Sequence, residues 1–256
     1  MRIASMTRAA VAAALTLLAA GSAIAAEVKV LASTAIKSSL ELLAPQFETA
    51  SGHKLAITYG ASARLVPEIE KGRAFDLAIL SATVTDALIE KGALLAATRI
   101  DIARSGAGVA VRSGAPPPDI GTVDAFRRTL LAAKSLGYSE TGAGGQFLMT
   151  MFQHLGIADE MKPKLRLAQP NKPSLQSLAD GEIDLGIPQI SEALAFPGVD
   201  LIGPLPAELQ VYTVLPAAVS AKATSPEAAK ALIQFLTARA AIALLKAKGL
   251  EPGSPR

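Results

Sequence analysis

Short apolar runs alternate with amphipathic runs along the first third of the chain. Each apolar run predicts a buried strand, and each amphipathic run predicts a helix that ends at a glycine. Three strand–helix pairs follow one another, with strands over 28–32, 55–59 and 76–80 and helix-ending glycines at Gly52, Gly72 and Gly92. This βαβ spacing predicts a mostly parallel, doubly wound sheet with a ligand site at the carboxyl ends of its strands.

A second set of strands and helices begins near residue 106. An apolar strand over 106–112 precedes Pro116, Pro117 and Pro118, which impose an extended connection. Helices over 123–133, 146–155 and 174–179 then alternate with strands over 135–138, near Leu165 and over 183–187.

The last part of the chain is expected to return to the first set. A β-rich run over 209–219 precedes a helix that starts at Pro226, with Ser225 as its N-cap, and a final helix over 240–248. The pattern predicts an α/β protein of two doubly wound lobes, joined by two crossings, with a ligand cleft between them. Lobe 1 is expected over 27–107 and 209–256, and lobe 2 over 108–208.

Residues 1–26 have the pattern of a secretory signal peptide. Arg2 and Arg8 precede an apolar run over 9–20, and Ala23-Ile24-Ala25 follows as a cleavage pattern. The run is shorter than the about 20 residues of a membrane-spanning helix, so no membrane insertion is expected. Removal of the segment lowers the formal charge from +3 to +1, which disfavours a nucleic-acid partner. An exported chain without cysteine fits a bacterial periplasm, with secretion to the medium as the alternative.

Five loops between predicted strands and helices carry small or hydroxyl-bearing residues. Each alone is typical of helix capping, but together they can offer backbone N–H and hydroxyl donors to a small anion, each worth about 1.5–3 kcal/mol. The loops are Ser33-Thr34-Ala35, Tyr59-Gly60-Ala61-Ser62-Ala63-Arg64, Ser81-Ala82-Thr83, Ser139-Glu140-Thr141-Gly142-Ala143-Gly144-Gly145 and Gln189-Ile190-Ser191. Arg64 adds a full positive charge beside the second loop.

Several other kinds of chemistry lack their motif. Phe147 replaces the last glycine of a dinucleotide fingerprint, and no Lys-Ser or Lys-Thr pair completes a P-loop. His53 and His154 have no companions at metal-ligand spacing, so no metal and no cofactor is expected. Acid–base chemistry stays open, because Glu140, Glu192 and Tyr59 are expected near the cleft. The alternative is that both glutamates only stabilise first helical turns.

The order of these segments resembles the periplasmic molybdate-binding protein family of ABC importers. The resemblance spans almost the whole chain after residue 26, and its most specific part is the run Phe75-Asp76-Leu77-Ala78-Ile79. It implies the type II periplasmic binding fold, an oxyanion held between two lobes, and delivery to a membrane permease. Ser62 matches a ligand-binding serine of that family, but Ala35 and Gln189 replace an expected serine and tyrosine, and Glu192 replaces an aspartate.

Four other stretches resemble a divergent branch of this family that includes periplasmic aconitate isomerase. They are 103–106, 116–120, 189–192 and 203–208. That resemblance implies an allylic proton shift, with Arg64 and Lys172 as carboxylate clamps and Glu140, Glu192 or Tyr59 moving the proton. Two hypotheses therefore stand, a binding protein for an oxyanion or a small di- or tricarboxylate, and an isomerase on the same scaffold; both predict a monomer.

Overall fold

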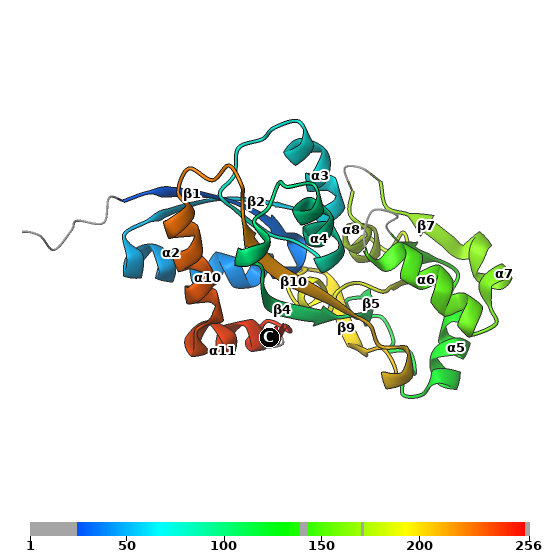
Figure 1. Cartoon of the computed structure of the whole chain (residues 1–256). Coiled ribbons are helices and arrows are strands. Elements are labelled where there is room, and N and C mark those ends of the chain that lie inside the picture. Colours follow the sequence, from blue (N-terminus) through cyan, green and yellow to red (C-terminus); the bar gives the residue numbers. More distant parts are fainter. Residues whose placement is uncertain (1–24, 139–142, 170–171, 254–256) are drawn as a thin grey trace, which may run out of the picture.

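The computed structural model describes residues 25–138, 143–169 and 172–253, and the predicted signal peptide lies outside this part. Two β-sheets lie in separate halves of the molecule, each with helices on both faces (Figure 1). We call the first sheet with its helices lobe 1, and the second sheet with its helices lobe 2. The chain is a mixed α/β protein of the kind predicted. The residue ranges predicted for the two lobes stay a prediction.

The first sheet has the strand order β11-β4-β10-β3-β1-β2. Its strands are β1 (Glu27–Ser33), β2 (Lys54–Gly60), β3 (Leu77–Ile79), β4 (Ile100–Gly106), β10 (Tyr212–Val219) and β11 (Glu251–Pro252). β1 pairs in parallel with β2 and β3, whereas β10 runs antiparallel to both β3 and β4. The three strand–helix pairs predicted from the sequence therefore form one parallel edge of this sheet.

Alternating side chains of the first sheet enter two different cores. Val30 and Ala32 pack under one face with the helices α2 and α10, whereas Leu31 and Ala78 pack under the other face with α3 and α4. Figure 1 shows α2, α10 and α11 on one side of the sheet and α3 and α4 on the other. The helices of this lobe are η2 (Thr34–Ile36), α2 (Lys37–Ser51), α3 (Ser62–Glu70), α4 (Ala82–Glu90), η3 (Ala96–Thr98), α10 (Pro226–Thr237) and α11 (Arg239–Ala247).

The second sheet has the strand order β7-β6-β8-β5-β9. Its strands are β5 (Gly108–Arg112), β6 (Leu136–Tyr138), β7 (Leu165–Leu167), β8 (Leu185–Gly186) and β9 (Val199–Pro204). Phe126, Leu130 and Phe152 form a core on one face, and Leu178 and Ala193 pack on the other. The helices are α5 (Val123–Ala132), α6 (Ala143–His154), α7 (Ala158–Met161), η4 (Lys162–Lys164), α8 (Ser174–Ala179), α9 (Ile190–Ala193) and η5 (Ala207–Leu209).

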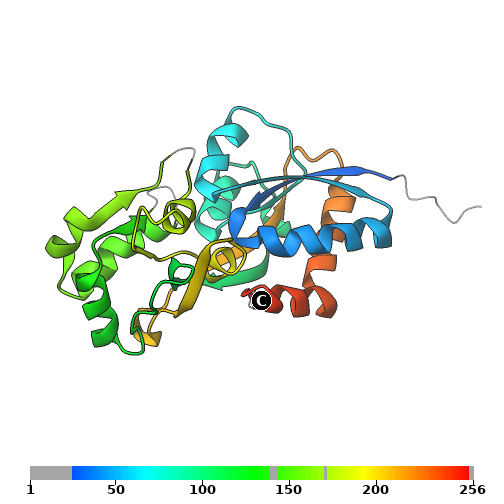
Figure 2. The ribbon, with the colours of Figure 1, turned by 180° about the vertical axis from the view of Figure 1, so that it is seen from behind.

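The chain passes between the lobes twice, at Ala107 and over 205–211. The Gln210 side chain joins these two crossings, because its Oε1 accepts the Ala107 N–H and its Nε2 donates to the Ala107 carbonyl, both over 3.0 Å. Ala107 N also donates to the carbonyl of Val211 over 3.1 Å. Figures 1 and 2 show β4 and β10 running towards the second sheet, next to β5 and β9. The two crossings are therefore hydrogen-bonded to each other rather than independent.

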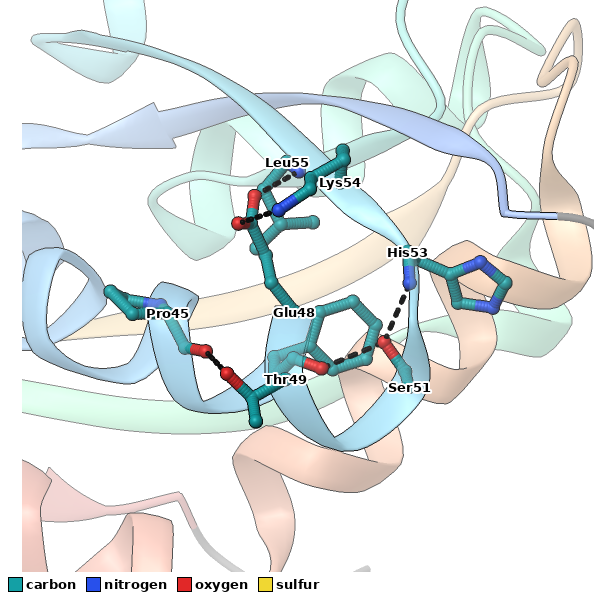
Figure 3. Close-up of polar contacts among 8 residues, drawn as sticks. Pro45, Glu48, Thr49, Ser51, His53, Lys54 and Leu55 are labelled. Atoms are coloured by element: carbon teal, nitrogen blue, oxygen red, sulfur yellow. Dashed lines mark hydrogen bonds and ion pairs between the residues drawn. The ribbon is translucent and has the colours of Figure 1, made fainter.

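The turn between α2 and β2 shows how local sequence fixes the start of a strand (Figure 3). Gly52 ends α2 with φ of 75°, a left-handed conformation that favours glycine. Glu48 then accepts the Leu55 N–H over 2.8 Å and pairs with Lys54 over 2.9 Å, and these contacts lower the pKa of Glu48. His53 accepts the N–H of Ala26, so this histidine joins β2 to the segment before β1.

Three expectations about secondary structure need correction. Of the nine strand pairings in the described residues only four are parallel, so the sheets are mixed rather than mostly parallel. The cause is that β5 and β10 each enter their sheet from a crossing and pair antiparallel. β4 was not predicted as a separate strand, and α6 begins at Ala143, three residues before the predicted start.

Among the described residues, no single helix is long and apolar enough to cross a membrane. Only α10 and α11 taken together reach that length and composition, and they are bent by 65° to each other. Their apolar residues Leu232, Leu236 and Leu245 belong to the core of lobe 1.

Candidate functional site

The first two predicted anion loops lie side by side at the carboxyl edge of the first sheet. β1 and β2 pair in parallel so that Ser33 lies opposite Gly60, the last residue of each strand. Ser33 is buried as the N-cap of η2 and accepts the Ala35 N–H over 3.3 Å. Thr34, the next residue, is exposed. A Cβ at Gly60 would lie 3.1 Å from Leu65, so glycine keeps the second loop close to its helix.

The second and third loops are joined by a hydrogen bond. Ser62, the first residue of α3, accepts the N–H of Ser81 through its Oγ over 2.9 Å. Ser81 is the N-cap of α4, and Ala61 is the N-cap of α3. Because the Ser62 oxygen is already an acceptor, its own O–H remains as a donor. Three loops after β1, β2 and β3 therefore share one edge of the sheet.

The short helix α9 of lobe 2 contacts lobe 1 through three polar side chains. Thr34 Oγ1 donates to Glu192 Oε1 over 2.5 Å, which places the fifth predicted loop against the first. The buried hydroxyls of Ser191 and Ser105 lie 3.1 Å apart. Gln189, the N-cap of α9, donates from Nε2 to Thr213 Oγ1 over 2.6 Å.

Gln189 is engaged at this junction in a way that the sequence does not reveal. Its Oε1 is buried and has no partner among the described residues, while its Nε2 is taken by Thr213. Rotation of the carboxamide would let the Thr213 hydroxyl donate to Oε1 and would leave the NH₂ group as a donor for a ligand. Gln189 as a ligand-binding residue thus stays a prediction.

The acid–base candidates differ in their surroundings. Burial raises the pKa of Glu192, and the hydrogen bond from Thr34 opposes this shift. Burial and the nearby Glu41 carboxylate raise the pKa of Tyr59 to about 12, and its ring packs against the core of lobe 1. Tyr59 therefore stays protonated at neutral pH and is unsuited to act as a base. Glu192 is the described candidate whose environment favours its protonated form.

The remaining predicted residues fall into three groups. Glu140 and Gly142 lie outside the described residues. Ala143, Gly144 and Gly145 form the first turn of α6, so their backbone N–H groups are at a helix start rather than in a loop. Arg64 is exposed near the start of α3.

Lys172 does not lie free as a carboxylate clamp. Its Nζ lies 2.7 Å from Asp180 and 2.6 Å from Glu182, and these two carboxylates raise its pKa. The expected positive charge is therefore already balanced within lobe 2. This corrects the interpretation of Lys172 as a group held ready for a ligand.

Two cavities of the described surface lie away from the predicted loops. One of 480 Å³ lies beside α4 and is lined by Asp86, Arg99 and Asp101, where the arginine pairs with both aspartates. Another of 270 Å³ lies beside the middle of β1 and β2. Neither includes a predicted ligand-binding residue. Within the described residues, no three His, Asp or Glu side chains are grouped as a metal site.

The structure adds residues to the site that sequence patterns did not indicate. Ser105, Thr213 and Gln210 come from the ends of the crossing segments and hold α9 or Ala107. Alternation of Ile100 and Ile102 with Asp101 is the one pattern that signals β4, and through it the position of Ser105. Nothing in the sequence pairs Thr34 with Glu192.

Comparison with known proteins identifies the family. The sequence profile of the family described as bacterial extracellular solute-binding protein matches residues 28–251. The chain belongs to this family. It is 33% identical over 228 residues to aconitate isomerase from Pseudomonas sp., covering 87% of each chain. It is also 28% identical to the molybdate-binding protein ModA of Escherichia coli, over 81% of this chain and 83% of that protein.

The fold of this solute-binding protein agrees with solved structures. The periplasmic molybdate-binding protein of Azotobacter vinelandii superposes with a TM-score of 0.71 at 21% identity, covering 90% of this chain and all of that one. The predicted resemblance to the molybdate-binding family and its two-lobed fold is confirmed. The chain is thus a bacterial extracellular solute-binding protein whose fold is similar to that of molybdate-binding proteins.

Proposed function

We propose that this protein binds a small di- or tricarboxylate anion between its two lobes in the periplasm and delivers it to an ABC importer. The observation that carries the proposal is the contact between Thr34 and Glu192, which brings lobe 2 onto the edge of the first sheet where three hydroxyl-bearing loops of lobe 1 lie. A small anion held there gains from neutral N–H and O–H groups without a metal. The signal-peptide pattern of residues 1–26 supports export to the periplasm.

A carboxylate is favoured over a tetrahedral oxyanion for two reasons. Arg64 stands beside the second loop, and a guanidinium matches the two oxygens of a planar carboxylate through parallel hydrogen bonds. Glu192 adds an acidic group beside the first loop, and a protonated carboxyl can donate to a ligand carboxylate. The relative named aconitate isomerase acts on a tricarboxylate, which supports the same class of ligand.

The second candidate function is isomerisation of aconitate. In an allylic shift a base removes a proton from the methylene carbon, the double bond moves by one position, and a proton returns to the former alkene carbon. Glu192 is the described group suited to hold that proton, and the aconitate isomerase relative at 33% identity favours the idea. Incubation with trans-aconitate followed by separation of the isomers distinguishes the two functions. If the protein binds trans-aconitate but does not convert it, the isomerase hypothesis is refuted.

Thermal unfolding with candidate ligands tests the binding function. A ligand at 100 times its dissociation constant adds about 2.7 kcal/mol, which is readily seen as a rise in Tm. We expect stabilisation by trans-aconitate, cis-aconitate or citrate and little by sulfate. Stabilisation by molybdate or tungstate alone would refute the carboxylate assignment, and no response to any of these anions would refute anion binding.

The substitution Arg64→Met tests the clamp directly. We expect the dissociation constant of the carboxylate to rise at least about tenfold, which corresponds to about 1.4 kcal/mol. The control is Arg128→Met, which removes the same charge from an exposed position on α5. Equal, small effects of both substitutions would show that Arg64 does not hold the ligand.

A further inference from the structure

Glu192 occupies an unusual position for a carboxyl group next to a site for anions. It lies on α9, and in Figure 2 this yellow segment lies beside the start of the blue helix α2, between the two lobes. The residue is partly buried, and its Oε1 accepts the hydroxyl of Thr34 over 2.5 Å. Thr34 belongs to the first predicted anion loop. Its hydroxyl, which was expected to donate to the ligand, therefore donates to the Glu192 carboxylate instead.

Among the described residues, no cation balances Glu192. Its pKa responds to burial and to the Thr34 hydrogen bond, and several charged groups on the elements around α9 have other partners. These groups are Lys37 after η2 with Glu41, Arg104 of β4 with Glu251, and Asp200 of β9 with Ser113. Arg112 of β5 lies beside Gly181, and Lys246 and Lys248 lie at the end of α11, whose following Gly249 approaches Leu194.

A charged Glu192 would repel the ligand that the neighbouring loops attract. Two like charges a few ångströms apart in a partly buried site repel each other strongly enough to offset good hydrogen bonds. One proton shared between Glu192 and a ligand carboxylate turns this repulsion into a hydrogen bond. A ligand carboxylate and Glu192 carry the same functional group, so one proton can lie in a hydrogen bond between their oxygens.

We infer that Glu192 is a specificity residue of the anion site, which takes up one proton when a carboxylate ligand binds and donates it to a ligand oxygen. The proton comes from solvent and adds to the Glu192 carboxylate, and no other bond forms or breaks. Thr34 is then free to donate to the ligand as well. The inference rests on the proposed anion-binding function and adds a linkage between ligand binding and protonation.

Burial gives this linkage its direction. Because burial already raises the pKa of Glu192, and a bound anion raises it further, the complex holds the proton to a higher pH than the free protein. Between these two pKa values, binding takes up a proton. In this range affinity falls by up to about tenfold per pH unit, and above the pKa of the complex it no longer depends on this group.

Isothermal titration calorimetry with trans-aconitate measures this uptake. Titrations in two buffers of different ionisation enthalpy give the number of protons bound, and trans-aconitate contributes its own protons equally to all variants. We expect the full-length mature protein to take up more protons than Glu192→Gln, by up to one. The glutamine keeps a partner for Thr34 and an N–H donor, so its affinity is expected to vary less with pH.

Two further variants keep the test decisive. Glu160→Gln removes the same charge from an exposed position on α7 and is expected to retain the proton uptake of the unaltered protein. Thr34→Val removes the hydrogen bond that stabilises charged Glu192 in the free protein. The free variant is therefore expected to hold the proton to higher pH and to take up fewer protons on binding, a readout that remains even if the glutamine variant fails to fold.

The outcomes separate this inference from the function on which it rests. Equal proton uptake by the unaltered protein and Glu192→Gln overturns the inference and leaves anion binding intact. Binding of molybdate without binding of trans-aconitate overturns both the inference and the carboxylate assignment. Binding of neither anion by the folded protein overturns the proposed function itself.

Discussion

Thr34 and Glu192 are separated by 158 positions, yet the Thr34 hydroxyl donates to Glu192 Oε1 over 2.5 Å. The contact joins the first turn after β1 to α9, and so lobe 1 to lobe 2. Two neighbours of Glu192 on the same segment, Ser191 and Gln189, also bond to lobe 1. The relative position of the lobes near the candidate site thus depends on polar contacts, which a bound ion or a proton can alter.

Replacing Glu192 by glutamine is expected to stabilise the ligand-free protein at neutral pH. The pKa of Glu192 is raised by burial, so the folded protein binds its proton more tightly than the unfolded chain. The stability this proton confers is complete below the usual value of 4.5 and is lost as pH rises through the folded pKa. The Glu192→Gln variant has no such loss of stability. Its Tm should therefore exceed that of the unaltered protein by more at pH 7 than at pH 4.

The control for this prediction is Glu160→Gln, on the surface of α7. The effect of Glu160→Gln on Tm is expected to be small, because this side chain is exposed. Each 1 kcal/mol changes Tm by about 2–4 °C in a protein of this size, which thermal melting by circular dichroism resolves. A Glu192→Gln variant that melts lower at pH 7 than at pH 4, relative to the unaltered protein, would contradict the burial argument.

The parallel edge of lobe 1 could be predicted from the sequence because local signals and tertiary structure agree there. Apolar runs, helix periodicity and the terminal glycines Gly52, Gly72 and Gly92 all mark the same boundaries, and the three glycines have positive φ. The loops that begin at Ser33, Ala61 and Ser81 therefore lie at helix starts as expected. Their shared edge follows from parallel pairing alone.

The junction between the lobes could not be predicted in this way, because its contacts are non-local. Whether Gln189 meets Thr213, or Ser191 meets Ser105, depends on how two separately folded sheets are set against each other. A serine or glutamine has the same local pattern whether it binds a ligand or a neighbouring lobe. Lys172 shows the same limit, since its partners Asp180 and Glu182 are brought close only by the fold.

Ser62→Ala is expected to weaken anion binding and to loosen the contact between the second and third loops. The Ser62 oxygen accepts from Ser81, which leaves its O–H to donate to a ligand. Loss of one hydrogen bond to a charged acceptor costs about 1.5–3 kcal/mol, or about 10- to 150-fold in the dissociation constant. Isothermal titration calorimetry, with the ligand identified by thermal shift, measures this change in the dissociation constant.

The matched control for Ser62 is Thr49→Ala. This substitution also removes a hydroxyl, but Thr49 donates to the carbonyl of Pro45 on the surface of α2 (Figure 3). Thr49 lies near the end of α2, whereas the first anion loop precedes the start of this helix. The dissociation constant of the ligand should be the same for Thr49→Ala and the unaltered protein. Equal affinity of Ser62→Ala and Thr49→Ala would remove Ser62 from the proposed binding site.

Asp76→Asn is expected to destabilise lobe 1 without touching the anion loops. Asp76 is buried and accepts the N–H groups of Lys29 over 2.8 Å, Thr224 over 2.7 Å and Ser225 over 3.0 Å. An asparagine turns an NH₂ group towards one of these donors and leaves it unpaired, at a cost of about 1–3 kcal/mol in the free energy of unfolding. Urea denaturation measures it.

The same aspartate predicts a loss of stability in acid. Burial alone would raise the pKa of Asp76, but the hydrogen bonds from Lys29, Ser225 and Thr224 outweigh it and lower the pKa. The stability that the charged form confers is present above the usual value of 3.8 and is lost as pH falls through the lowered folded value. The difference between the unaltered protein and Asp76→Asn should therefore shrink in acid, whereas a constant difference would contradict this account.

Gln210→Leu is expected to loosen the two crossings between the lobes. Gln210 binds both the N–H and the carbonyl of Ala107, each over 3.0 Å, and leucine has no group to replace either contact. Ala107 keeps the carbonyl of Val211 as an acceptor and Leu205 as a donor, so the loss should be limited to about 1–3 kcal/mol. Amide hydrogen exchange at Ala107 should accelerate by at least about tenfold, since each 1.4 kcal/mol of lost local stability gives that factor.

Gln153→Leu, on the exposed face of α6, is the control and should leave that exchange rate unchanged. Unchanged protection of Ala107 in Gln210→Leu would show that the backbone contacts alone hold the crossings together.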